Sequence, residues 1–201
     1  LYQPLISLII FLLISGLHFA NSEYNDDEKI NKASFFSHAG LVPIIIPWMH
    51  TKEVIDIFFL LAGDAATLLI PLIAYLFYGW VFVFFLYTVN FIRRKSSVQR
   101  YVQLIILLIM IYLLPPLISF SIYFCLIHGP RHMKKVLRKL SKKKKHQAIK
   151  EALVYSMVTF VLIFSSAYYV SDNKMISEDL LRITFIALAA LTVPHMILVD
   201  Y

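Results

Sequence analysis

The chain has 201 residues, of which 60% are hydrophobic and 15% are charged, and its formal net charge is +7. A soluble domain of this size normally carries about a quarter charged residues, so the composition excludes an ordinary soluble globule, and the abundance of apolar side chains excludes a disordered chain. The apolar residues come in long runs, and a membrane span needs about 20 of them. The sequence therefore predicts an all-α fold, a polytopic transmembrane helical bundle with about six to eight membrane segments that form a single transmembrane domain over residues 1–201.

The first predicted element is a membrane helix from Leu1 to Ala20, followed by a polar, acidic loop over residues 21–32. The chain starts without Met and without a basic leader, so we expect an N-terminally truncated protein rather than a signal peptide. The next apolar stretch, His38 to His50, contains two prolines and is too short to span a bilayer. It is therefore predicted to be re-entrant or interfacial, because irregular backbone at membrane depth needs protein or water partners.

The longest apolar run extends from Ile57 to Ile92, and Asp64 is its only charged residue. As one helix it would be about 54 Å long at 1.5 Å per residue, well beyond a core of about 30 Å. We therefore predict two helices that separate near Tyr78 and Gly79. Charged groups at membrane depth are costly and tend to be functional, which makes Asp64 a candidate buried carboxylate.

The second half of the chain contains three further apolar segments. Residues 101–127 are interrupted by Pro115 and Pro116, which predicts either a kinked span or a tight hairpin. Residues 152–170 and 183–199 are predicted spans. Between these segments, residues 129–150 are rich in Lys and Arg and lack acidic residues. In a membrane protein this pattern indicates a cytoplasmic loop beside anionic lipid rather than a nucleic-acid site.

Three of the seven histidines have the spacing or surroundings expected of a metal site. His128 and His132 are four residues apart, so on a helix they share one face and can bind the same ion. His18 ends the first apolar run, and Glu23 follows as a candidate acceptor for a ring N–H. Neutral imidazoles are common ligands of iron, zinc and copper. The competing interpretation is that these histidines lie at a membrane interface above the basic loop.

The orientation predicted from the charges of the loops conflicts in part with a metal site formed by these histidines. It sets residues 129–150 inside the cell and the acidic loop outside, which would separate His18 and His132 by the thickness of the membrane. Ligands of one ion must meet. We expect convergence, because acidic residues contribute little to the orientation rule.

Three motifs together resemble the Brp/Blh family of integral-membrane β-carotene 15,15′-dioxygenases. They are His-Phe-Ala-Asn-Ser-Glu at 18–23, Tyr-Phe-Cys-Leu-Ile-His-Gly-Pro-Arg-His at 123–132, and Pro-His-Met-Ile-Leu-Val-Asp at 194–200. The resemblance covers essentially the whole chain. Two positions depart from the family pattern, since Ala20 replaces a usual Gly and Glu23 replaces a usual Asp.

The resemblance implies a multi-pass enzyme of the cell (inner) membrane that uses Fe²⁺ and O₂ to cleave β-carotene at its central double bond into two retinal molecules, commonly supplied to a microbial rhodopsin. It assigns the iron to His18, His128 and His132, with a further histidine in a segment before Leu1. Glu23, Arg131, His195 and Asp64 are the additional candidates near the metal or the cavity.

Two functions from other classes remain open at this point. The first is a transporter or channel-like protein in which intramembrane His and Asp residues relay protons or ions without metal catalysis. The second is a non-catalytic membrane assembly protein. Iron content distinguishes the enzyme from both, and nucleic acid is not expected as a partner of any of them.

Overall fold

The structure is a computed structural model, and it describes residues 3–24, 30–93, 97–138, 140–170, 181 and 184–185. Within these ranges all regular secondary structure is helical and there are no strands. The predicted all-α fold is confirmed. The predicted last span, residues 183–199, lies almost wholly outside the described residues, and His195 lies outside them as well.

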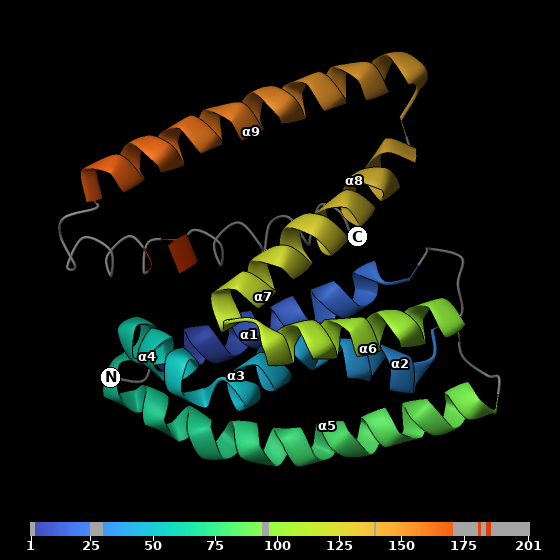
Figure 1. Ribbon diagram of the computed structural model, residues 1–201, viewed down its shortest axis with the longest axis vertical. Helices are drawn as coiled ribbons and strands as arrows, with labels where there is room; N and C mark the ends of the chain where they lie inside the picture. Colours follow the sequence, from blue (N-terminus) through green and yellow to red (C-terminus); the bar gives the residue numbers. More distant parts are fainter. Residues whose placement is uncertain are drawn as a thin grey trace.

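The first half of the chain forms a bundle around its first helix. Its elements are α1 (Gln3–Ser22), α2 (Lys32–Ala39), the π-helical turn η1 (Leu41–Ile45), α3 (Ile46–Met49) and α4 (Thr51–Ala62). Helix α1 packs against α2, η1 and α4 (Figure 1). The side chain of Asn31 caps α2 by accepting a hydrogen bond from the Ser34 amide, 3.2 Å away. The 38–50 stretch is short and irregular, as expected for a segment that does not span.

The long apolar run breaks in a different place from the one that the sequence predicted. A 3₁₀ segment, η2 (Gly63–Leu68), separates α4 from α5 (Leu69–Ile92), and α5 continues through Tyr78 and Gly79 without interruption. Gly63 has φ of +63°, a conformation that glycine adopts readily and other residues avoid. Gly79 has no such constraint, and an isolated glycine inside a helix costs only about 1 kcal/mol.

This break also changes the interpretation of Asp64. It lies in η2, between two helices, and is exposed rather than buried. The prediction of a buried carboxylate in mid-helix is therefore wrong. The physical reason is that the local backbone turn at Gly63 brings the following residue to the outside of the bundle.

The two prolines divide the next apolar segment sharply. Helix α6 (Val98–Leu113) ends before them, and Pro116 is the first residue of α7 (Pro116–Ile122), a position where a missing N–H costs nothing. Helix α7 continues through the π-helical η3 (Tyr123–His128) into α8 (Gly129–Arg138). Figure 1 shows α6 and α7 meeting at an angle, and α7 running on toward α8. A long helix, α9 (Lys142–Val170), follows.

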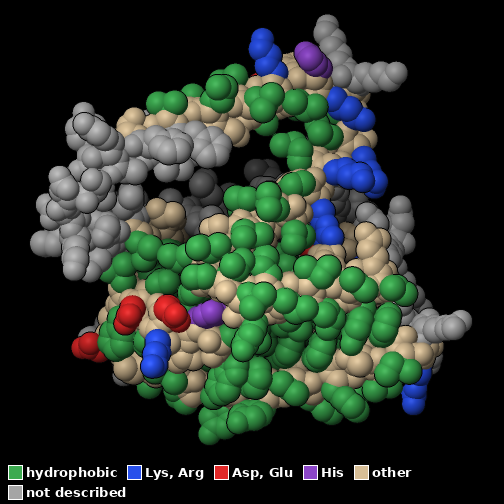
Figure 2. Space-filling view, in the orientation of Figure 1, with side chains coloured by type: hydrophobic (Ala, Val, Ile, Leu, Met, Phe, Trp, Pro, Cys, Tyr) green, Lys and Arg blue, Asp and Glu red, His purple; other side chains and the backbone are tan. Residues whose placement is uncertain are grey.

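The exterior of the bundle is strongly apolar. Figure 2 shows hydrophobic side chains covering much of the visible face, with Lys and Arg gathered along one upper edge. Tyr75, Phe82 and Phe85 on α5 are 77%, 63% and 61% exposed. Two segments, Gln3–Ser22 and Thr51–Ile92, are long and apolar enough to cross a membrane, and Val98–Leu113 is a shorter apolar helix. This exterior suits hydrocarbon, but the predicted six to eight spans are not reached within the described residues.

Candidate functional site

Two of the predicted metal ligands meet inside the bundle. His18, in the last turns of α1, and His128, at the end of η3, have ring centroids 5.0 Å apart with the rings edge to face. Each residue is only 4% exposed. The expected approach of His18 to the second histidine segment is confirmed for this pair, although 110 residues separate them in the sequence.

Both imidazoles line one cavity of the described structure. Its volume is about 510 Å³, within the range of 300–1,000 Å³ typical of sites for small ligands. Apart from the histidines and Ser15, its lining is apolar. Six phenylalanines contribute to it: Phe11, Phe19, Phe58, Phe120, Phe124 and Phe185. A cavity of this kind accepts a hydrocarbon and offers it two imidazoles.

Aromatic rings fix the plane of the His128 imidazole. The Phe19 ring meets it edge to face at 4.9 Å between centroids, and the Phe124 ring stacks on it at 5.5 Å with an interplanar angle of 25°. Pro130 lacks an N–H, and the preceding turn is π-helical, with the Gly129 amide donating to the Phe124 carbonyl. A π turn inserts one extra residue and is frequent at functional sites. Here it sets the direction in which His128 leaves the helix.

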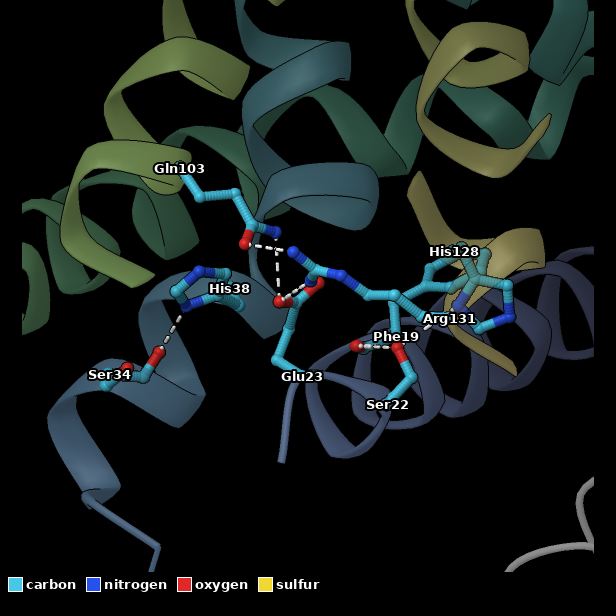
Figure 3. Close-up of polar contacts among 8 residues, drawn as sticks. All are labelled: Phe19, Ser22, Glu23, Ser34, His38, Gln103, His128 and Arg131. Atoms are coloured by element: carbon cyan, nitrogen blue, oxygen red, sulfur yellow. Dashed lines mark hydrogen bonds and ion pairs between the residues drawn. The ribbon is translucent and has the colours of Figure 1, made fainter. Parts of the chain in front are cut away.

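Ser22 joins the end of α1 to the His128 ring. Its hydroxyl lies 2.7 Å from the Phe19 carbonyl oxygen and 3.1 Å from Nδ1 of His128 (Figure 3). Ser22 follows His18 by four residues and therefore lies on the same face of α1. The last turn of α1 thus supplies one imidazole and also holds the other.

Glu23 has partners other than a histidine ring. Its carboxylate forms an ion pair with Arg131 and accepts a hydrogen bond of 2.9 Å from Nε2 of Gln103. Arg131 also donates to the Gln103 side-chain oxygen, which closes the three side chains into one cluster (Figure 3). The Glu23 side chain is 1% exposed, whereas that of Arg131 is 36% exposed. Glu23 therefore does not serve as the predicted acceptor for the ring of His18 or His128, because its partners are Arg131 and Gln103.

The remaining predicted ligand stays a prediction. His132 lies in α8, about one helical turn after His128, and its side chain is outside the part that the structure describes. His195 is outside the described residues altogether. Among the side chains that are described, no group of three His, Cys, Asp or Glu residues is gathered closely enough to hold a metal ion.

A further buried histidine, His38, was expected at an interface and is found in the core. It is 1% exposed, and its Nδ1 donates to the Ser34 carbonyl oxygen at 2.8 Å. Burial lowers the pKa of His38 below its ordinary value of 6.5, against the smaller opposing effect of the Glu23 carboxylate. His38 is therefore neutral at pH 7.

Ser22 and Gln103 are the two residues of this region that the sequence did not identify. For Ser22 a signal existed, because its spacing from His18 places both on one helical face. For Gln103 there was none: it is one of several polar residues in the first two turns of α6, and only the tertiary packing brings it to Glu23.

Comparison with known proteins gives a consistent assignment. A family model described as β-carotene 15,15′-dioxygenase matches residues 1–201. A curated relative of the same name, from the uncultured marine bacterium 66A03, is 35% identical over 207 aligned positions, which cover 100% of this chain and 74% of the relative. No solved structure matches the chain. The chain therefore belongs to the β-carotene 15,15′-dioxygenase family.

Proposed function

We propose that this protein is an iron-dependent membrane dioxygenase that cleaves β-carotene at its central double bond and releases two molecules of retinal. The observation that supports this best is the meeting of His18 and His128 at the lining of an apolar, aromatic cavity. Such a reaction requires the protein to supply nitrogen ligands for the metal and an apolar cavity for the hydrocarbon substrate. The name of the curated relative supports the same substrate.

The donor set suits non-haem iron. Imidazole is a common ligand of Fe²⁺, and sites that leave coordination positions open are typical of oxygenases of this kind. In our proposal His18, His128 and His132 hold the ion, because His132 follows His128 by four residues on one helix. Bound iron would supply the redox chemistry by which O₂ attacks the double bond.

The chain's own residues perform the remaining tasks. The phenylalanines of the cavity hold the polyene and exclude water, and the cavity brings the middle of the substrate beside the two imidazoles. The central double bond breaks, and each of its two carbons receives one oxygen atom of O₂, so that each half ends in an aldehyde. Glu23 and Arg131 neutralise each other away from the lining of this cavity, so neither contributes a charge to it.

The location of the enzyme follows from the solubility of its substrate. β-Carotene is dissolved in the bilayer, and an embedded enzyme receives it laterally without passage through water. The exposed apolar side chains of α5 support this arrangement. We propose a multi-pass protein of the cell (inner) membrane, whose retinal is available to a microbial rhodopsin.

The proposal is tested in a bacterial strain that accumulates β-carotene. The full-length protein should bleach the colour and yield retinal, and the variants His18→Ala and His128→Ala should lower retinal yield by more than about 100-fold, beyond the effect of losing a supporting hydrogen bond. His146→Ala is the matched control, because His146 is exposed on α9. Detergent-purified protein should contain iron in the full-length form and lose it in both site variants.

Two results would end the proposal. An unchanged retinal yield in His128→Ala would contradict the proposed histidine metal site. Purified protein that forms no retinal and holds no iron would contradict the proposed enzymatic activity. The second result would favour transport. The exposure of Asp64 at a helix junction argues against the transport hypothesis in which this residue relays protons or ions.

A further inference from the structure

The hydroxyl of Ser22 has two neighbours with different hydrogen-bonding capacities. One is the carbonyl oxygen of Phe19, 2.7 Å away, three residues earlier on the same helix. The other is Nδ1 of His128, 3.1 Å away on another helix. A carbonyl oxygen can only accept, whereas a ring nitrogen of neutral imidazole donates or accepts according to the tautomer.

These capacities determine where the protons lie. The single hydroxyl proton of Ser22 must point to the Phe19 carbonyl, because two oxygens 2.7 Å apart without a proton between them repel each other. The serine oxygen then has only lone pairs to offer to His128. Nδ1 of His128 is therefore the nitrogen that carries the proton, and Nε2 carries the lone pair of the neutral ring.

This tautomer has a consequence for metal binding. A metal ion binds the nitrogen lone pair, and the hydrogen bond of the other nitrogen decides which lone pair is presented. A free imidazole in water prefers the opposite tautomer, with the proton on Nε2. Phe19 and Phe124 hold the ring plane but provide no acceptor for Nδ1–H. The ring could turn over within the same aromatic surroundings if nothing bound one nitrogen.

We propose that Ser22 is a positioning residue that holds His128 in the Nδ1–H tautomer and so presents Nε2 to the metal. This inference rests on the proposed function, since it takes His128 as a ligand. It adds a residue that makes no contact with metal or substrate. Because the Ser22 hydroxyl donates its proton to the Phe19 carbonyl, the Ser22 oxygen can only accept a hydrogen bond from Nδ1–H of His128.

The first test measures metal affinity. Full-length protein is purified in detergent, stripped of metal and titrated with Co²⁺ under argon while the visible absorption of the cobalt site is followed. Ser22→Ala should weaken Co²⁺ binding about 10- to 100-fold, the usual cost of losing a hydrogen bond that supports a metal ligand. Ser22→Thr should bind like the parent, because it keeps the hydroxyl, and Ser22 is not fully buried, so that a methyl group can be accommodated.

The matched control is Ser37→Ala. Ser37 is fully buried, and its hydroxyl also donates to a carbonyl of its own helix, that of Ala33 at 2.8 Å. This variant removes a buried hydroxyl of the same kind without touching His128. Its cobalt affinity and spectrum should match those of the parent. A loss in both alanine variants would mean that general destabilisation, and not Ser22, causes the effect.

A second test reads the tautomer without any metal. In the metal-free protein labelled with ¹⁵N-histidine, NMR should show the His128 proton on Nδ1, and Ser22→Ala should move the population toward Nε2–H. The assignment of the signal comes from its loss in His128→Ala. If the parent protein binds Co²⁺, then unchanged ¹⁵N chemical shifts of the His128 ring together with unchanged Co²⁺ affinity in Ser22→Ala would overturn the inference. If the parent itself binds no metal, the proposed function fails instead.

Discussion

Two adjacent residues at the end of α1, Ser22 and Glu23, contact different partners on the segment that contains η3 and α8. On one side Ser22 holds His128 beside His18 at the lining of an apolar cavity. On the other side Glu23, the next residue, is bound to Arg131 and Gln103. The first side presents imidazoles to a hydrophobic space, whereas the second pairs its charges with each other.

The difference shows how one short motif performs two tasks. The end of a helix lets consecutive side chains leave in different directions, so Ser22 and Glu23 reach different partners from neighbouring positions. The charged cluster attaches α1 to α6 and α8, which keeps the two imidazoles close together. A charge buried without such a partner would be costly. We therefore expect substitutions on the polar side to affect stability and those on the cavity side to affect catalysis.

The largest effect on this comparison should come from Arg131→Met. It leaves the Glu23 carboxylate buried without its cation, and removal of one member of a buried pair costs about 3–5 kcal/mol. We expect about 3 kcal/mol, because Arg131 is partly exposed. Equilibrium unfolding of the detergent-purified protein measures this loss in the free energy of unfolding. The double variant Glu23→Gln with Arg131→Met should regain most of the loss, and a double variant as unstable as the single one would contradict the role of the charge.

A smaller effect should follow from Gly16→Ala, two residues before His18 on α1. A Cβ atom at this position would lie 2.5 Å from the Ala39 carbonyl oxygen and 3.0 Å from Cγ of Pro43. Helix α1 would have to move away from its neighbours, at a cost of about 1–3 kcal/mol. Thermal unfolding should show the loss, together with reduced retinal formation.

The matched control for Gly16→Ala is Gly79→Ala in α5. Nothing lies within 4 Å of a Cβ built there, so this change should be neutral or stabilise by about 0.5–1 kcal/mol. Equal destabilisation by the two alanines would show that close packing at Gly16 is not the cause.

The smallest expected effect concerns the shape of the cavity. Val42 in η1 is one of its lining residues, and Val42→Phe places a larger ring there. We expect kcat/KM for β-carotene to fall about tenfold, as for other small changes in the volume of a hydrophobic site, with iron content unchanged. Val81→Phe, on the 42% exposed Val81 of α5, is the control. Unchanged kcat/KM in Val42→Phe would place the substrate elsewhere.

Several features of the fold were predictable from local sequence. The helix ending at Ser22 followed from an unbroken apolar run, and the break at Pro115 and Pro116 followed from proline chemistry. The break in the long run was placed wrongly at Tyr78 and Gly79. Glycine permits a turn without requiring one, so composition alone could not choose between Gly63 and Gly79. The burial of His38 was missed because a histidine between apolar residues suits an interface as well as a core.

The sequence by itself determined the helical class, the apolar exterior and the identity of the candidate ligands, because these depend on composition and on spacing along one helix. Only the tertiary structure decided that His18 meets His128, that Ser22 rather than Glu23 holds the ring, and that Glu23 pairs with Arg131. Such contacts join residues about a hundred positions apart. They depend on how whole helices pack and on the direction in which each side chain leaves its turn, and no local pattern encodes either.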